Sequence, residues 1–141
     1  MTMLSPLGAA IAELSADPAV AAITTRVRPI EPAAGDAKSA GSYLPFVVVS
    51  VLDAPYQAET ATSSVSLGLR CYAATFAEAE ALYLACAAAF HRKGPRVAAS
   101  RLGIYNSLVA GGGVFDKDPD TFQPLVHGAV EMHVSIQPIP A

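Results

Sequence analysis

A strictly alternating segment near the middle of the chain places the tightest limit on the fold. In SSVSLGLRCYA, residues 63–73, apolar and polar or small side chains follow one another with a period of two. Val65, Leu67, Leu69 and Cys71 therefore fall on one side of an extended strand, and Ser66 and Arg70 fall on the other. The segment predicts a strand with one face in a hydrophobic core.

An alanine-rich helix is predicted directly after this strand. Thr75 and Glu78 have the spacing of a capping box, in which each side chain satisfies a free amide at the helix start. Three large aromatic side chains recur every seven residues along one helix face: Phe76, Tyr83 and Phe90. Such a stripe of large and small groups is suited to packing on a sheet. Gly94 and Pro95 are predicted to stop the helix.

The remaining periodic segments complete an α+β order. Ser5 and Pro6 open a first helix, and Asp17 with Pro18 predicts a second short turn. Extended segments are predicted at residues 26–29 (an edge strand), 43–52 (YLPFVVVSVL, covered on both faces), 101–109 and 125–139. We expect one domain over residues 1–141, with a mainly antiparallel sheet of about four to five strands and two helices packed against it.

Three segments lack an apolar period and are rich in Pro, Gly and polar residues. Residues 30–42 are predicted as a loop, residues 53–63 as a turn or hairpin arm, and residues 110–124, including Gly111 to Gly113, as a long flexible arm. Tyr56, Phe115 and Phe122 lie in these arms, where a large apolar side chain needs cover. The arms could fold back on their own domain or contact another subunit, and we predict the subunit contact.

Composition excludes several classes of protein. The formal net charge is −3 and the pI is about 5.5. Because domains that bind nucleic acid carry a basic face, these values argue against a nucleic-acid-binding protein. No apolar run approaches the roughly 18 residues of a membrane span, and Glu13 and Asp17 interrupt any secretory signal. Cys71 and Cys86 form no CxxC unit, which favours reduced thiols in a cytoplasm.

The search for reactive groups yields one weak metal candidate. His127, Glu131 and His133 share one face of the last strand. At about 3.3 Å per residue the two histidines lie about 20 Å apart, so only Glu131 and His133 could share an ion. The competing interpretation, which we favour, is a polar outward face or a subunit contact. A small metal-dependent enzyme that uses Glu131 and His133 remains a third hypothesis.

Other candidate motifs have simpler interpretations. Asp116 to Asp120 resembles the opening of a calcium loop, but Thr121 and His127 stand where glycine and glutamate are required, so a solvated acidic turn is predicted. Cys71 and Cys86 are predicted as packing groups. Four cations follow the long helix, and a solvated helix end or a salt-bridged contact is favoured over a nucleic-acid site: Arg92, Lys93, Arg96 and Arg101. We therefore assign no catalytic, cofactor-binding or metal residue and predict that the chain is not an enzyme.

The ordered segments resemble the phage tail terminator family, together with small tail-completion proteins of prophages and gene transfer agents. The resemblance lies in SPLGAAIAELSADPAVAAITTRV, then YLPFVVVSVLDAP, then LGLRCYAATFAEAEALYLACAAAF, and last a strand pair ending in GAVEMHVSI. It covers most of the chain. The loops, including GGGVFDKDPD, match no fixed pattern of that family, and the family supplies no catalytic motif.

This resemblance implies a structural virion protein of the tail or neck, assembled in the cytoplasm of a host bacterium. Family members form a ring, commonly a hexamer, that caps the last ring of the tail tube, stops its growth and meets the head connector. The implied partners are other copies of the chain, joined through strand-bearing arms, the tail tube protein on one face and a head-completion protein on the other. DNA would pass through the channel without being read, and no membrane or cofactor is implied. A head-side neck or stopper protein is the alternative.

Overall fold

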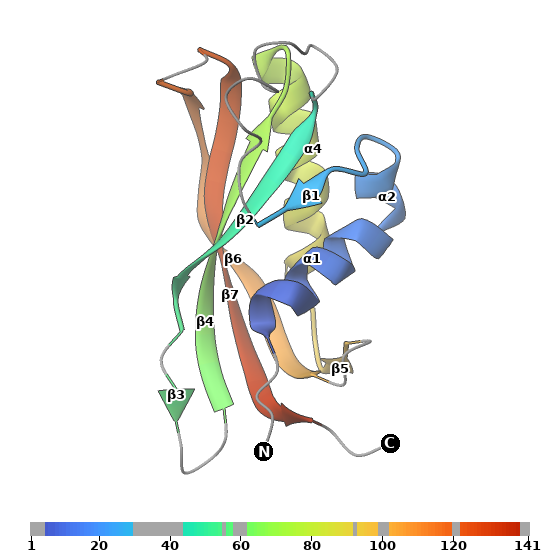
Figure 1. Cartoon of the computed structure of the whole chain (residues 1–141), viewed down its shortest axis with the longest axis vertical. Coiled ribbons are helices and arrows are strands. Elements are labelled where there is room, and N and C mark those ends of the chain that lie inside the picture. Colours follow the sequence, from blue (N-terminus) through green and yellow to red (C-terminus); the bar gives the residue numbers. More distant parts are fainter. Residues whose placement is uncertain are drawn as a thin grey trace.

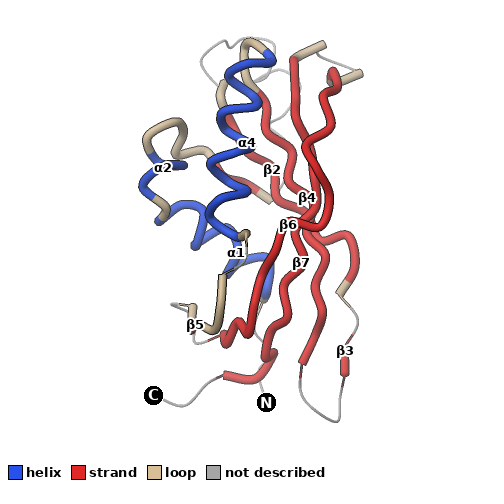
Figure 2. Tube along the Cα trace, turned by 180° about the vertical axis from the view of Figure 1, so that it is seen from behind, coloured by secondary structure: helices blue, strands red, loops and turns tan. Residues whose placement is uncertain are grey.

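The computed structural model describes residues 5–29, 44–54, 56–57, 62–91, 93–98, 102–119 and 122–138. These residues form a strongly twisted seven-stranded sheet with three helices on one face (Figures 1 and 2). The helices are α1 (Pro6–Ala16), α2 (Pro18–Ala21) and α4 (Phe76–Phe90). The strands are β1 (Val27–Arg28), β2 (Phe46–Asp53), β3 (Tyr56–Gln57), β4 (Thr62–Tyr72), β5 (Arg96–Val97), β6 (Leu102–Lys117) and β7 (Pro124–Pro138).

The sheet has the strand order β1-β2-β4-β7-β6-β5, and β3 pairs with the start of β4. Only β1 and β2 run parallel among the described strands. β4 pairs with β7 in unbroken register, from Thr62 opposite Ser135 to Tyr72 opposite Leu125. β6 and β7 form a long hairpin in which β6 shifts register at several bulges. Bulges of this kind bend a strand and increase its twist, as Figure 2 shows for this pair.

Each helix begins at a side chain that caps it, as the sequence predicts. The Ser5 hydroxyl accepts from the Gly8 amide at 3.1 Å, and Asp17 Oδ1 accepts from the Ala19 and Val20 amides. The Thr75 hydroxyl accepts from the Glu78 amide at 3.2 Å. These bonds satisfy amides that lack a partner within their own helix and so fix the first residue of each helix.

The two faces of the sheet carry separate apolar clusters. The predicted inward residues of β4 are all buried against the helices, where the main core also includes Leu14, Leu82 and Phe90. The opposite face holds a small cluster of Phe46, Val48, Tyr72 and Leu125, with the Phe46 and Tyr72 rings stacked at 4.5 Å between centroids. The first half of β2 is therefore buried on both faces, as its apolar run predicts, whereas Val51 and Leu52 are exposed.

The ring of Tyr83 brings α4 close to the β6–β7 hairpin. A Cβ atom built on Gly128 would overlap the phenol oxygen of Tyr83, and one built on Gly113 would lie 3.0 Å from its ring. Real Cβ atoms essentially never approach other atoms so closely. Glycine at these two strand positions therefore makes room for an aromatic ring between the helix and the sheet.

Several predictions about the elements need correction. The sheet has seven strands and the described chain has three helices, in place of about four to five strands and two helices. Gly111 to Gly113 lie inside β6 and not in a mobile loop, because pairing with β7 continues through them by register shifts. α4 ends at Phe90, before Gly94 and Pro95, because His91 adopts an extended conformation. The predicted loop at residues 30–42 lies outside the described residues.

Replacing Gly128 with alanine is expected to destabilise the fold by about 1–3 kcal/mol, because the new methyl group must displace the buried Tyr83 ring. Urea unfolding followed by circular dichroism measures this change. Gly94→Ala is the matched control, since a Cβ atom there meets nothing within 4 Å. The double variant Gly128→Ala/Tyr83→Leu should lose less free energy of unfolding than the sum of the losses in the two single variants. Equal effects of the two glycine substitutions would contradict this packing.

Candidate assembly surfaces

The face of the sheet opposite the helices exposes a mixture of polar and apolar side chains. Leu52, Tyr105, Leu108 and Val114 are exposed large apolar residues. Leu108 lies opposite Glu131 and Val114 lies opposite His127 across the β6–β7 pair, so each pair shares this face. No described helix lies over this face (Figure 2). An uncovered sheet face with large apolar groups is a feature of surfaces that bind other proteins.

His127, Glu131 and His133 share this outward face, as their spacing predicts. The Ser64 hydroxyl lies 3.2 Å from Nδ1 of His133, and the Tyr105 ring packs beside it with centroids 5.3 Å apart. A shallow groove of about 230 Å³ runs past Ser64, Asn106 and Glu131 to His133. Among the described residues, no three His, Cys, Asp or Glu side chains gather as metal ligands. His133 is therefore held by a hydroxyl and an aromatic ring in a polar surface.

The tip of the β6–β7 hairpin carries Phe122. Phe122 has a φ of 58° and 73% of its surface is exposed. Its amide donates to the Asp118 carbonyl at 2.8 Å, and the Asp118 amide donates to the Gln123 carbonyl at 3.0 Å. A positive φ costs a non-glycine residue about 1 kcal/mol or more, so the turn holds this aromatic side chain outward against strain.

The three residues predicted at a subunit contact lie in different places. Phe115 lies on β6, 52% exposed, with its ring edge against Phe76 at a centroid distance of 5.9 Å. It is therefore partly covered by its own protomer. Phe122 follows on the same hairpin, whereas Tyr56 lies on β3, far from the tip (Figure 1). The backbone of Tyr56 pairs with Ser63, and its side chain lies outside the described residues.

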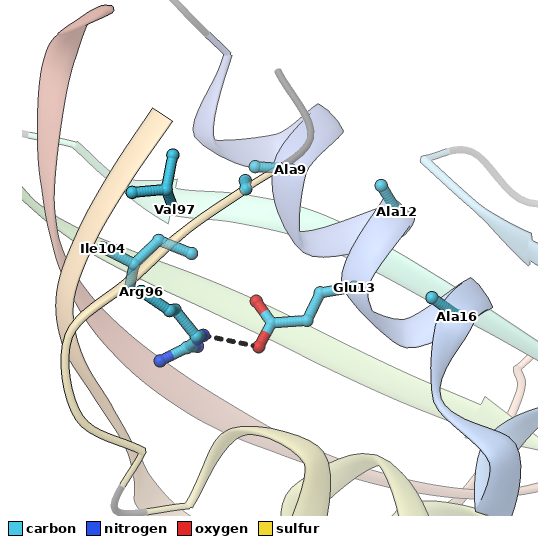
Figure 3. Close-up of a pocket in the computed structure, with 8 residues that line it drawn as sticks. Ala9, Ala12, Glu13, Ala16, Arg96, Val97 and Ile104 are labelled. Carbon is cyan, nitrogen blue, oxygen red and sulfur yellow. Dashed lines mark hydrogen bonds and ion pairs between the residues drawn. The ribbon is translucent and has the colours of Figure 1, made fainter. Parts of the chain in front are cut away.

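A cluster of charged residues ties β5 to α1. Arg96 Nε donates to Glu13 Oε1 at 2.7 Å (Figure 3). Arg96 Nη2 donates to the Ser107 hydroxyl at 2.8 Å. The Ser107 hydroxyl in turn donates to the Phe90 carbonyl at the end of α4. Lys93 lies 3.8 Å from the same Glu13 oxygen. The predicted salt-bridged contact is confirmed for Lys93 and Arg96, and it joins four elements of the fold.

Beside this cluster lies an apolar groove that the sequence did not predict. It has a volume of about 220 Å³ and lies between α1 and β5 (Figure 3). Apart from Glu13 and Arg96 its lining is apolar: Ala9, Ala12, Ala16, Val97, Ala98 and Ile104. The spacing of the three α1 alanines, at intervals of three and four, marks one helix face without large side chains. That spacing alone does not distinguish a groove from a core, because alanines suit a helix face that packs on either.

The cysteines are core residues, as predicted. Cys71 and Cys86 are free and buried. A hydrogen bond with Cys86, together with burial, raises the pKa of the Cys71 thiol well above its ordinary value. The thiolate is the reactive form of cysteine, so Cys71 is unsuited to act as a nucleophile at neutral pH. Within the described ranges, no helix is both long and apolar enough to cross a membrane.

The fold and its surfaces describe a scaffold that acts through contacts with other proteins, and the comparisons agree. Residues 8–133 match the family described as Tail completion protein gp17, and the chain belongs to this family. It is a structural protein of a phage tail, and not an enzyme. The hypothesis of an enzyme using Glu131 and His133 is therefore wrong.

A solved structure has the same fold. The chain superposes on a chain of the virion of native gene transfer agent (GTA) particle with a TM-score of 0.61 and 18% sequence identity, covering 92% of this chain and 94% of that one. No curated protein sequence matches closely enough to count as a relative. The predicted resemblance to tail-completion proteins is thus confirmed by the family and by the fold.

Replacing Glu13 with alanine is expected to lower the free energy of unfolding by about 1–3 kcal/mol, because it removes a charged acceptor from the largely buried Arg96 guanidinium. The double variant with Arg96→Met should show a coupling energy of about 1 kcal/mol that decreases with added salt. Glu80→Ala, at an exposed position on α4, is the control and should change stability by less than about 0.5 kcal/mol. Strict additivity of the two substitutions would count against this ion pair.

Proposed function

We propose that this protein is a tail terminator. Its subunits join head to tail into a closed ring, a hexamer as in the family it resembles, that caps the last ring of the tail tube and stops tube growth. The ring then joins the tube to the head connector. The observation that carries this proposal is the match to the tail completion family over residues 8–133.

The surfaces of the fold support a role in assembly. Helices cover one side of the sheet, while the other side and the hairpin tip expose large apolar side chains. Exposed apolar groups that gather on one uncovered face, such as Leu52, Tyr105 and Leu108, support a surface for contacts with other proteins. Closed rings need two different contact patches on each copy, and the chain has exposed apolar groups at separate places on its fold.

The proposed partners follow from the position of such a ring. The tail tube protein binds one face of the ring and a head-completion protein binds the other, within the neck or tail of the virion, after assembly in the bacterial cytoplasm. A net charge of −3 supports passage of DNA without binding, because a basic channel would retain phosphate groups. We further propose that Tyr56, Phe115 and Phe122 contribute to contacts between subunits or with these partners.

The alternative is a head-side neck or stopper protein. Such a protein would also form a ring and would use the same kinds of surface, but it would bind the portal or adaptor. The capped helix followed by the β6–β7 strand pair favours the tail side, as in the family resemblance. The two proposals differ in which purified partner the ring binds.

Light scattering of the purified protein is expected to give the mass of a ring of identical subunits. Mixed with the tail tube protein, the protein should cap tube ends in negative-stain images and shorten the tubes as its concentration increases. An unrelated acidic protein of similar mass is the control for nonspecific effects. A ring that ignores tubes but binds the portal or adaptor would select the neck protein, and a monomer that binds none of these would refute both proposals.

A further inference from the structure

We propose that Phe122 of one copy inserts into the α1–β5 groove of the next copy and so forms the contact that closes the ring. This inference rests on the proposed ring function and specifies one of its interfaces. The occupant of the groove is thus a second copy of this chain. Four features of the described residues carry the proposal: the form of the tip, the size and lining of the groove, the charges around both, and their separation within one copy.

The tip presents its aromatic ring ready for insertion. Phe122 is the most exposed large apolar residue described, at 73%. Its amide is bonded to the Asp118 carbonyl, and the neighbouring Asp118 amide is bonded to the Gln123 carbonyl. The backbone that carries the ring is therefore fixed before any contact forms. Binding then has to fix the side-chain rotamer of Phe122 but not its backbone, which lowers the entropy cost of the contact.

The groove matches a phenyl ring in size and chemistry. Its volume is about 220 Å³, whereas an apolar cavity of about 150 Å³ is large enough to hold benzene. Its lining is apolar except for Glu13 and Arg96, and those two side chains already bind each other. Val97 stands exposed at the rim and would add contact area. Filling the groove therefore leaves no charge without its partner.

The charges around the two surfaces are complementary. At the base of the tip, the described charges of Asp116, Lys117 and the largely buried Asp118 sum to −1. Beside the groove, the described charges of Lys93, Arg96 and Glu13 sum to +1. Opposite charges at the edge of a contact raise the association rate and disfavour the wrong pairing of two like surfaces.

The two surfaces cannot meet within one copy. β5 pairs with Gly103 and Ile104 near the start of β6, whereas the tip follows Lys117 at its end (Figure 1). At about 3.3 Å per residue, β6 separates them by roughly 40–50 Å. Each copy therefore offers a tip to one neighbour and a groove to another. Contacts of this heterologous kind produce a closed ring when the rotation between copies closes.

Two complementary variants test the contact. Phe122→Ser removes the ring from the tip, and Ala12→Leu fills the groove. Each variant alone should fail to form the ring, with the subunit Kd raised about ten- to a hundredfold. An equimolar mixture should form a dimer and nothing larger, because only the intact tip of one variant can enter the intact groove of the other. Mass photometry and light scattering measure both results.

Matched controls separate this contact from general effects of mutation. Leu84→Ser and Ala81→Leu change exposed positions on α4 and should leave the ring intact. Circular dichroism melts show whether each variant is folded. Rings formed by both test variants, at the wild-type concentration, would overturn the proposed contact while leaving the terminator function standing. A mixture that stays monomeric in light scattering at about 1 mM protein, where a single contact of modest affinity is populated, would overturn it too.

If the wild-type chain is monomeric, a cross-linking experiment tests whether the tip of one copy meets the groove of another. Gln123→Cys places a thiol beside Phe122 in sequence, and Ser15→Cys places one at an exposed α1 position next in sequence to Ala16, which lines the groove. The native cysteines are buried and should not compete. Mixed and oxidised, these two variants should form a disulfide-linked dimer, whereas Gln123→Cys with Ala81→Cys should not. Equal yields of cross-linked dimer from the test mixture and the control mixture would overturn the contact. Cross-linking in the test mixture alone, with a wild-type chain that is monomeric, would support the contact between two copies while refuting the ring.

Discussion

The close approach of α4 to the β6–β7 hairpin determines much of the structure. The Tyr83 ring lies over Gly128 and Gly113, where any larger residue would force the ring out of its place between the helix and the sheet. With α4 seated there, the alternating apolar residues of β4 and β7 must face the same side to share its core. A register slip of one residue would turn all of them to the other face. The long, unbroken β4–β7 register follows from this requirement.

The same arrangement leaves the other side of the sheet available for contacts. All three described helices lie on one face, and the apolar cluster buried on the other is the small one around Phe46. The exposed groups there, from Leu52 to Val114, belong to strands whose inner faces are fixed by the core. The surface is therefore rigid although no described helix covers it. Rigidity of this kind suits a protein that must present the same surface to many identical partners.

The parts of this fold that depend on short-range patterns were predictable from the sequence. The caps at Ser5, Asp17 and Thr75 and the buried side of β4 are set by residues a few positions apart, and all are present. Gly111 to Gly113 were assigned to a flexible arm because three glycines locally favour a loop. Their strand conformation comes from pairing with β7, which is a tertiary effect.

The candidate surfaces were predicted less completely, for a related reason. Phe122 could be placed outside the core segments, where it needs cover, because a large apolar residue in a polar segment is visible in the sequence. The groove could not, because Ala9, Ala12 and Ala16 are equally good helix formers whether they face a core or a hollow. These alanines line a groove because β5 lies opposite α1, where the ion pair between Arg96 and Glu13 holds it.

The polar network beside the groove helps to explain how a small contact between copies could be enough to form a ring. Arg96, Glu13 and Ser107 connect α1, β5, β6 and the end of α4, so the groove exists before a partner arrives. A single aromatic side chain in such a groove gives only modest affinity between two copies. In a closed ring, however, each copy makes two such contacts, and losing one subunit breaks both at once. The second contact forms at the high effective concentration set by the first, so ring closure stabilises the assembly far beyond the strength of one contact.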